Sequence, residues 1–291
     1  MNIEQPERQS VAVITATYRR AEAIQVWLPQ ALALQGVSEI VVVLDGPDAD
    51  TARLLSNCRD DRLRFAVQPH QGVQAARRHG IDLATSDWIF LLDDDDGAPP
   101  SHILELVKAA ERHQADVVGS PWMPWRAGRS SASLYEEETA RPHRSFNLYS
   151  PPWSVPFADA ETPFLPALVL MRREVAAVVF ASQREVKGNA WREETQMFLQ
   201  LHSQGLKLIL ARNSYTDALG AFEGGHHRSR IKYECSLASN EVLFVHRHRD
   251  QLTRLGDPHP GRSSIMFLLR RAVELGRGWL DRRTSSDAID R

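Results

Sequence analysis

Four consecutive aspartates, Asp93–Asp96, are the residues of this chain with the clearest capacity for chemistry. Adjacent carboxylates repel one another, so such a run persists most naturally where a divalent cation offsets the repulsion. Hard oxygen ligands suit Mg²⁺ or Mn²⁺, which commonly join a few carboxylates to the phosphates of a substrate. The alternative is a solvated acidic turn ahead of a helix expected near Pro100, because acidic side chains favour helix N-termini.

A second candidate is basic. Gly72 precedes the sequence Ala76-Arg77-Arg78-His79-Gly80. On a helix of small residues, Arg77 and Arg78 can offer a guanidinium group to a diphosphate. The alternative is a solvated basic face with no ligand.

Alternating strands and helices must position these segments. Buried strands are expected at Val11–Thr15, Glu39–Leu44, Leu63–Val67 and Trp88–Leu92, separated by helices at Ala21–Gln35, Thr51–Asn57 and Gln74–Ala84. This alternation predicts βαβ units on a parallel sheet, and such sheets bind ligands outside the carboxyl ends of their strands. Thr17, Asp45 and the aspartate run each follow a strand directly, so we expect them at that edge.

The later segments are less regular. Residues 121–166 hold many prolines and little periodicity, which predicts a long functional loop. Trp122, Trp125 and Trp153 in it would stack on sugar faces or pack in the core. A basic amphipathic helix is expected over Ile265–Leu280; it docks onto the protein's own core or lies on an anionic membrane or a partner.

Composition excludes several classes of protein. The net charge is −2, from 35 basic and 37 acidic residues, which argues against wholesale nucleic-acid binding. Two distant cysteines make no disulfide framework, so a reducing cytoplasm is expected. The polar N-terminus lacks the apolar region of a secretory signal, and apolar runs fall short of the roughly 20 residues that span a bilayer.

In order and spacing, residues 11 to about 107 resemble the family 2 glycosyltransferases of the GT-A fold. The motifs that carry the resemblance are Ala16-Thr17-Tyr18-Arg19-Arg20, the turn Leu44-Asp45-Gly46-Pro47, Gly72 with Ala76-Arg77-Arg78-His79-Gly80, and Asp93-Asp94-Asp95 followed by Asp96. Two departures are Leu44, in place of an acidic residue, and Arg78, in place of the usual Asn. They leave the identity of the nucleobase open.

The resemblance implies an α/β fold with a mixed, mostly parallel sheet flanked by helices. It implies a GT-A domain over residues 1–225, with a nucleotide-sugar half at about 11–120 and an acceptor half at about 121–225. A C-terminal loop and helical extension would occupy residues 226–291.

The resemblance also implies roles for single residues. Donor-binding residues would be Thr17, Tyr18, Asp45, Arg77, Asp93 and Asp94; Asp45 would meet the base, with Thr17 and Tyr18 lining its pocket, and Arg77 would face the base or the diphosphate. Asp95, with Asp93, would hold the Mn²⁺ or Mg²⁺ ion.

A carboxylate pair in the acceptor half, Glu193-Glu194, is similar to the family's Glu-Asp pair at the head of a helix. One of the two would act as the general base that deprotonates the acceptor hydroxyl. The alternative is ordinary charge at a helix N-terminus. His226, or His227, would supply a late metal ligand, and a plain surface loop is the alternative there.

We therefore expect an inverting, metal-dependent transfer from a UDP- or GDP-sugar to a carbohydrate, lipid or small-molecule acceptor. The protein would be cytoplasmic, or peripheral at the inner face of the membrane through its C-terminal basic helix. Two other classes stay open: a metal-dependent nucleotidyltransferase or phosphohydrolase using the same aspartates, and a non-catalytic relative that binds nucleotide sugars. The Gly-rich, Lys-containing loop expected of sugar nucleotidyltransferases is absent after Val11–Thr15.

Overall fold

The structure is a computed structural model, and it describes residues 9–143, 148–150, 152–182, 192–220 and 230–286. The chain divides into two compact units. Unit 1 comprises Met1–Glu185 and Glu194–His226, and unit 2 comprises Val186–Glu193 and His227–Arg291. The domain boundary expected at residue 225 stays a prediction.

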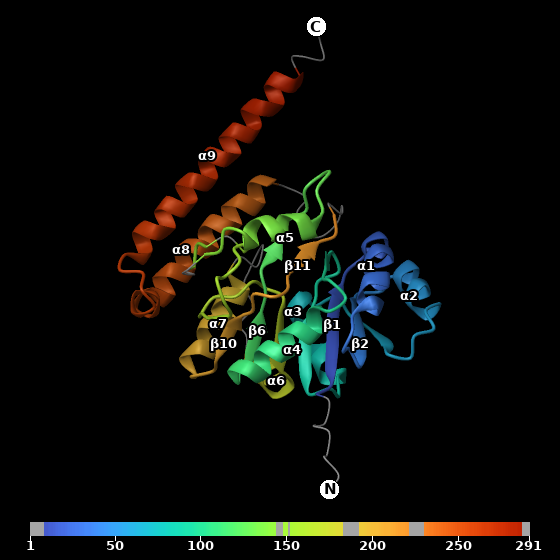
Figure 1. The fold of residues 1–291 in the computed structure, drawn as a ribbon. Coiled ribbons are helices and arrows are strands. Elements are labelled where there is room, and N and C mark those ends of the chain that lie inside the picture. The colour runs from blue at the N-terminus through green and yellow to red at the C-terminus, as the bar shows by residue number, and fades with distance from the viewer. Residues whose placement is uncertain (1–8, 144–147, 151, 183–191, 221–229, 287–291) are drawn as a thin grey trace. The chain divides into compact units, whose positions relative to one another are not determined.

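Unit 1 is built on an eight-stranded sheet whose strand order is β3-β2-β1-β4-β9-β6-β10-β8 (Figure 1). Its strands are β1 (Val11–Thr17), β2 (Glu39–Asp45), β3 (Leu63–Gln68), β4 (Trp88–Leu91), β6 (Val117–Gly119), β8 (Ala160–Glu161), β9 (Val169–Arg172) and β10 (Leu208–Leu210). The first four strands are parallel, as is the β6–β10 pair, whereas β9 is antiparallel to both its neighbours and β8 is antiparallel to β10. The predicted fold class, a mixed and mostly parallel sheet, is confirmed.

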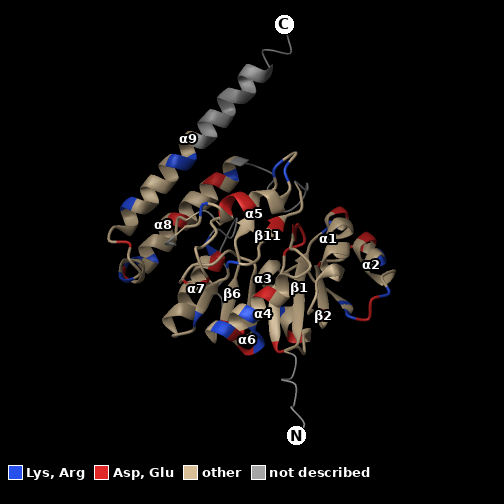
Figure 2. Ribbon diagram, in the orientation of Figure 1, with Lys and Arg blue, Asp and Glu red and all other residues tan. Residues whose placement is uncertain are grey.

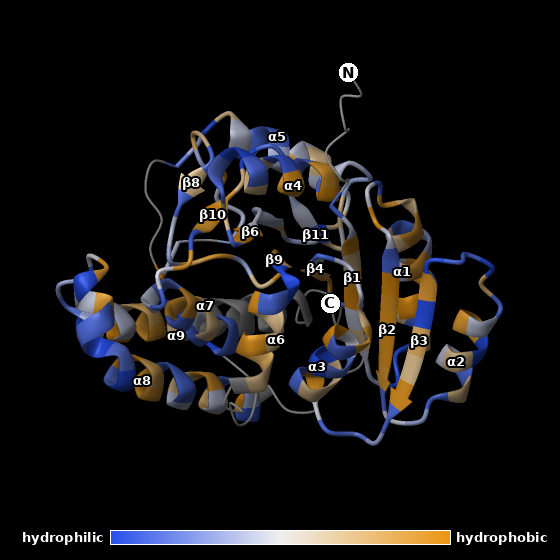
Figure 3. Ribbon diagram, turned by 90° about the horizontal axis from the view of Figure 1, so that it is seen from below, coloured by the Kyte–Doolittle hydropathy of each residue, from blue (hydrophilic) through white to orange (hydrophobic). Residues whose placement is uncertain are grey.

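Side chains of this sheet are buried on both faces. Successive residues of β1 alternate between two apolar clusters: Val11 and Val13 pack in one, and Ala12 and Ile14 in the other. This is the two-residue period of a strand covered on both sides. Strand β2 alternates between the same two clusters, and Figure 3 shows it hydrophobic along nearly its whole length.

Six helices accompany this sheet among the described residues. They are α1 (Ala21–Ala33), α2 (Ala49–Ser56), α3 (Val73–Leu83), α4 (His102–His113), α6 (Arg173–Ser182) and α7 (Glu193–Ser203). Helix α3 approaches the sheet closely at Gly80, where an added Cβ would lie 2.5 Å from Cγ2 of Ile14. The glycine therefore lets α3 lie directly on β1, with the start of the helix at the carboxyl edge of the sheet.

A small second sheet closes that edge. Its strands are β5 (Asp96–Gly97), β11 (Thr216–Ala218) and β7 (Trp122–Met123), with β11 in the middle. Asp217 pairs with Gly97 on one side and with Met123 on the other. Residues from three distant parts of the sequence thus meet beside the aspartate run.

The expectation that residues 121–166 form a loop without elements is wrong. This stretch contains β7, β8 and the helix α5 (Ser131–Thr139). Helix α5 begins where the hydroxyl of Ser130 accepts a hydrogen bond from the Ser133 amide at 3.2 Å. Leu134 is the one residue that this helix buries. One buried residue leaves no periodic apolar pattern in the sequence.

Unit 2 contains two long helices, α8 (Arg230–Arg254) and α9 (Pro260–Ser286), and α9 includes the helix expected over Ile265–Leu280. Helix α8 carries both basic and acidic residues, whereas the coloured part of α9 carries basic ones (Figure 2). In the unit's interior, Nε of Arg192 lies 2.7 Å from Oε2 of Glu241, and both side chains are buried. No helix among the described residues is long and apolar enough to cross a membrane.

Candidate functional site

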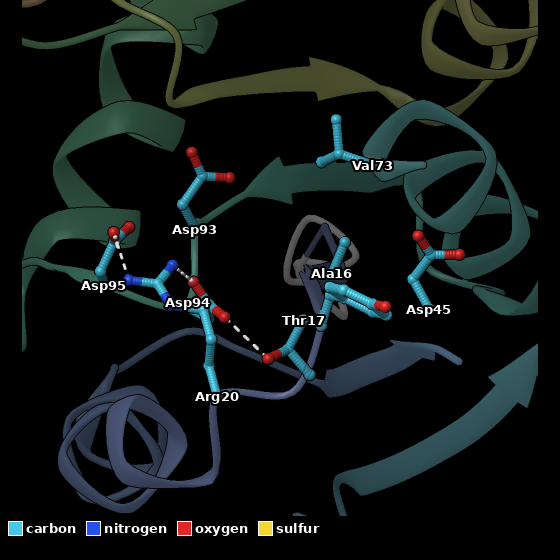
Figure 4. Close-up of a pocket in the computed structure, with 9 residues that line it drawn as sticks. Ala16, Thr17, Arg20, Asp45, Val73, Asp93, Asp94 and Asp95 are labelled. Carbon is cyan, nitrogen blue, oxygen red and sulfur yellow. Dashed lines mark hydrogen bonds and ion pairs between the residues drawn. The ribbon is translucent and has the colours of Figure 1, made fainter. Parts of the chain in front are cut away.

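A pocket of about 270 Å³ opens at the carboxyl ends of β1, β2 and β4 in unit 1 (Figure 4). Its lining residues are Ala16, Thr17, Tyr18, Arg20, Asp45, Val73, Asp93, Asp94 and Asp95. The structure therefore brings into one pocket most of the residues predicted to bind the donor, although they come from three separate strand ends.

Asp94 is the carboxylate that faces inward. Its Oδ2 accepts a hydrogen bond from the Thr17 hydroxyl at 2.7 Å, and its Oδ1 lies 2.5 Å from Nη1 of Arg20. Burial raises the pKa of Asp94 to about 7, although Arg20 and Thr17 act in the opposite direction. With both oxygens engaged and the side chain only 6% exposed, Asp94 supports the pocket wall.

Asp93 and Asp95 face the pocket opening, with side chains that are 35% and 40% exposed. Oδ1 of Asp93 accepts a hydrogen bond from Nη2 of Arg77 at 2.6 Å, and Oδ2 of Asp95 accepts one from Nη2 of Arg20 at 2.8 Å. These two carboxylates are the ones that an incoming ligand can reach.

These carboxylates fit a divalent cation whose coordination a ligand completes. Among the described residues, no group of three His, Cys, Asp or Glu side chains could hold a metal ion. Mg²⁺, however, is usually bound by one or two carboxylates together with substrate phosphates and water. Asp93 and Asp95 supply that smaller set, so they suit a metal that arrives with a diphosphate. His226, the predicted late ligand, lies outside the described residues, as does His227.

Asp96 points away from the pocket. The indole Nε1 of Trp122 donates a hydrogen bond to its Oδ1 at 2.8 Å. Burial, followed by the charge of Asp93, raises the pKa of Asp96 to about 8. Burial also raises the pKa of Asp217, which lies on the neighbouring strand β11.

Asp45 organises the loop between β3 and α3. Its carboxylate accepts hydrogen bonds from the backbone amides of Gln71 and Gly72, each at 2.8 Å, from the Gln68 side chain at 2.9 Å and from His70 Nδ1 at 2.8 Å. Burial raises the pKa of Asp45, but the hydrogen bonds outweigh this effect and the pKa is lowered. Four donors fill its acceptor capacity, so it fixes the rim of the pocket as a carboxylate.

An aromatic pair lies on the same rim. The rings of Tyr18 and His70 stack with centroids 4.1 Å apart and planes 21° from parallel. Gly72 has a φ of +94° as it begins α3, a conformation that glycine adopts at little cost. The loop thus presents flat side chains and a helix N-terminus next to the carboxylates.

Arg77 connects the pocket to the predicted base. It is buried, and besides its bond to Asp93 its Nη1 lies 3.6 Å from Oε1 of Glu194. The Glu194 side chain is 31% exposed, whereas Glu193 is only 2% exposed. The structure therefore separates the two glutamates that the sequence left equivalent: Glu194 faces the site residues of unit 1 and Glu193 is buried.

The three tryptophans predicted to stack on sugars have different surroundings. Trp122 is held by its bond to Asp96, and Trp153 packs against the small cluster of Met123, Leu134 and Val155. Trp125 is 51% exposed.

Two contributors to this site, Arg20 and Asp217, had no predicted role, and the bond of Trp122 to Asp96 was not predicted. Arg20 is the last residue of the first motif of the resemblance, residues 16–20. Its ion pairs with Asp94 and Asp95, however, depend on the turn between β1 and α1. Trp122 and Asp217 come beside Asp96 through the small second sheet. An available signal was that the late histidine of the resembled family falls near Thr216-Asp217, where this chain has no His.

The chain has measurable similarity to known proteins. A family model described as Glycosyl transferase family 2 matches residues 12–180, more than half of the chain. Over 134 residues the chain is 34% identical to the succinoglycan biosynthesis protein ExoO of Rhizobium meliloti (strain 1021), which covers 45% of this chain and 38% of that protein. It is 29% identical over 132 residues to the glucosyl-dolichyl phosphate glucuronosyltransferase of Haloferax volcanii, covering 44% and 42%. The match spans less than half the length of these relatives.

Solved structures resemble this fold as well. The structure of S. aureus TarS 1-349 in complex with UDP-GlcNAc superposes with a TM-score of 0.59 at 15% sequence identity, covering 86% of this chain and 72% of that chain. At this identity the likeness concerns the fold alone. Together with the family match over residues 12–180 and the pocket at the strand ends, it leads to one conclusion: the chain belongs to glycosyl transferase family 2.

Proposed function

We propose that this protein transfers a sugar from a nucleotide-diphosphate sugar to an acceptor hydroxyl, with inversion and with the help of a divalent cation. The observation that carries the proposal is that Asp93 and Asp95 face the pocket opening while Arg77 joins Asp93 to Glu194. Acidic groups for a metal-bound diphosphate thus lie next to a carboxylate able to act as a base. Membership of glycosyl transferase family 2 supports the proposal of a sugar transfer.

Asp95 and Asp93 are the residues that would hold Mn²⁺ or Mg²⁺. When bound, the ion would neutralise charge on the leaving diphosphate, which is electrostatic stabilisation of the transition state. Arg77, buried beside Asp93, adds a fixed positive charge on the same side.

Glu194 is the proposed general base. Its carboxylate accepts the proton of the acceptor hydroxyl as that oxygen bonds to the anomeric carbon and the bond from this carbon to the diphosphate oxygen breaks. One displacement of this kind inverts the anomeric configuration. Glu193 is not proposed for this role because its side chain is buried.

The donor's base would lie against the Tyr18–His70 pair, on the rim that Asp45 organises. Stacking accepts uracil or guanine, so UDP- and GDP-sugars are both proposed donors. The related structure with UDP-GlcNAc supports the first of these.

We propose that an anionic lipid surface is the partner of unit 2. Ile265, Met266, Leu269 and Val273 of α9 are 45% to 60% exposed and fall on one side of the helix at spacings of one, four and eight residues. Exposed Arg262 and Arg270 flank them and complement anionic headgroups. This would place a cytoplasmic enzyme at the inner face of the membrane, near lipid-linked acceptors.

Vesicle sedimentation tests this surface. The protein should pellet with phosphatidylglycerol vesicles and not with phosphatidylcholine vesicles, and Leu269→Glu should abolish pelleting. Val178→Glu, at an exposed position of α6 in unit 1, is the matched control and should pellet normally. Equal pelleting by both variants would refute the lipid contact.

The transfer itself is tested with Asp95→Ala. We expect a loss of donor turnover of about 10²- to 10³-fold with unchanged circular dichroism, because a group that stabilises the developing charge is removed. Asp50→Ala, at an exposed ion pair with Arg53, should keep full activity. The product must be a nucleoside diphosphate; pyrophosphate would indicate a nucleotidyltransferase, and binding without turnover would indicate a non-catalytic relative. Full activity in EDTA would contradict metal dependence.

A further inference from the structure

The Arg20 guanidinium occupies a position between two aspartates of the pocket, Asp94 and Asp95. Its Nη1 lies 2.5 Å from Asp94 and its Nη2 lies 2.8 Å from Asp95. Figure 4 shows this group between the two carboxylates, on the side of the pocket away from Asp45. A positive charge of the protein itself therefore offsets part of the repulsion in the aspartate run.

Local backbone geometry directs this side chain. Arg19 has a φ of +53°, a left-handed conformation that costs a non-glycine residue of the order of 1–2 kcal/mol. Arg20 follows as the first residue before α1, with a φ of −132°. Its side chain is 15% exposed, and its Nε is buried with no hydrogen-bond partner in the described part of the chain. The turn thus holds a guanidinium in the pocket with its Nε donor unused.

The two ion pairs of Arg20 differ in strength. Asp94 is 6% exposed and is fixed from its other side by the Thr17 hydroxyl. Asp95 is 40% exposed, and exposed ion pairs contribute little because water screens them. The bond to Asp94 is therefore an anchor, and the bond to Asp95 is the one that a ligand can break.

We propose that Arg20 is a positioning residue. Its guanidinium takes the place of the cation beside Asp95 until the donor binds. The inference rests on the proposed function, because it presupposes a divalent ion at Asp95. A dication and the guanidinium Nη2 would compete for Oδ2 of Asp95 and would repel each other. A nucleoside diphosphate brings the negative charge that lets both remain, with Arg20 still anchored on Asp94 and its Nη2 turned to a phosphate oxygen.

The consequence is a coupling between metal and nucleotide. The protein alone should bind Mn²⁺ weakly, and UDP or GDP should strengthen Mn²⁺ binding by the same factor by which Mn²⁺ strengthens nucleotide binding. Removing Arg20 should reduce this coupling, because Asp95 is then available to Mn²⁺ from the start.

Titration calorimetry of the full chain tests this with Mn²⁺ alone and with Mn²⁺ in the presence of UDP or GDP. Arg20→Gln should bind Mn²⁺ alone about tenfold more tightly than the wild type, within the usual range of coupling factors. Arg20→Lys should fall between them, because an ammonium contacts one carboxylate at a time. Arg53→Gln, at an exposed ion pair with Asp50, should match the wild type.

Circular dichroism establishes that each variant is folded, and a gain in metal affinity by a folded variant makes the outcomes distinct. Unchanged or weaker Mn²⁺ binding by a folded Arg20→Gln overturns the role of Arg20 and leaves metal dependence standing. If that variant does not fold, Arg20→Lys decides, and wild-type affinity in it overturns the role. Absence of Mn²⁺ binding by the wild type with either nucleotide overturns metal dependence and this inference together.

Discussion

Arginine–carboxylate pairs occur in both compact units, but their charge balance differs. In unit 2 a buried arginine, Arg192, faces a fully buried glutamate, Glu241, at 2.7 Å. In the pocket of unit 1, Arg20 is shared by Asp94 and Asp95. The first arrangement is balanced and closed to water, whereas the second keeps an excess of negative charge that is partly exposed.

The difference separates two uses of the same chemistry. Breaking a balanced buried pair leaves a charge without compensation in a low-dielectric interior, so the cost falls on stability. Removing a carboxylate from an acidic excess relieves repulsion, so the cost falls on ligand binding and catalysis. Four predictions test this contrast.

The largest effect is expected from Glu194→Gln. It removes the proposed proton acceptor, so kcat should fall by about 10² to 10⁴ while donor binding stays close to that of the wild type. Measuring kcat together with nucleotide affinity separates the two effects. A drop in affinity with unchanged kcat would instead assign Glu194 to donor binding through Arg77.

The next effect is on stability. Glu241→Gln removes the buried carboxylate that lies 2.7 Å from Nε of Arg192, and the free energy of unfolding should fall by about 3–5 kcal/mol. Urea denaturation measures this loss. Glu234→Gln, at the more exposed pair with Arg271, is the matched control and should cost about 1 kcal/mol or less. Equal losses in the two variants would remove burial as the explanation.

A buried histidine provides the third test. His102 is fully buried and bonds to the Ser214 hydroxyl at 2.7 Å, and burial lowers its pKa to about 3. Below its unfolded pKa of about 6.5 only the unfolded state takes up the proton, so stability should be lost as pH falls from about 6.5 towards 3, by about 1.4 kcal/mol per pH unit at most.

Urea denaturation from pH 7 to pH 4.5 checks this loss. His102→Asn should flatten the dependence of stability on pH, whereas the exposed His246→Asn should leave it as in the wild type. Parallel curves for His102→Asn and the wild type would show that other groups govern acid unfolding.

The smallest effect is the stability change in Asp95→Asn. The substitution loses an ion pair to Arg20 but also removes a negative charge from a crowded run, and the site is 40% exposed. The free energy of unfolding should therefore change by no more than about 1 kcal/mol, even though activity is lost. A loss as large as that in Glu241→Gln would mean that the aspartate run belongs to the structural core.

The donor side of the fold could be predicted from the sequence because its signals are local. Continuous apolar runs such as residues 40–44 indicate buried strands, and polar residues directly after them mark the binding edge of the sheet. Thr17, Asp45 and the aspartates were therefore predicted at one edge of the sheet, and they line one pocket there.

The remaining features depend on contacts between distant segments. Helix α5 has one buried residue and thus no apolar period. Glu193 and Glu194 are adjacent, and only the packing around the start of α7 decides which one is buried. The orientation of each aspartate, and the reach of Arg20 to two of them, follow from turn geometry that composition does not encode.

The loop that carries the aspartates is fastened at both ends. Before it, the Thr15 hydroxyl donates to the Leu92 carbonyl at 2.8 Å; after it, the Leu219 amide donates to the Asp95 carbonyl at 2.8 Å. Strand β11, late in the sequence, therefore completes an antiparallel pair with β5, which begins at the last of the aspartates. Any shortened version of this enzyme, and any graft of its acidic loop onto another scaffold, must include residues 216–219 if the carboxylates are to keep their orientation.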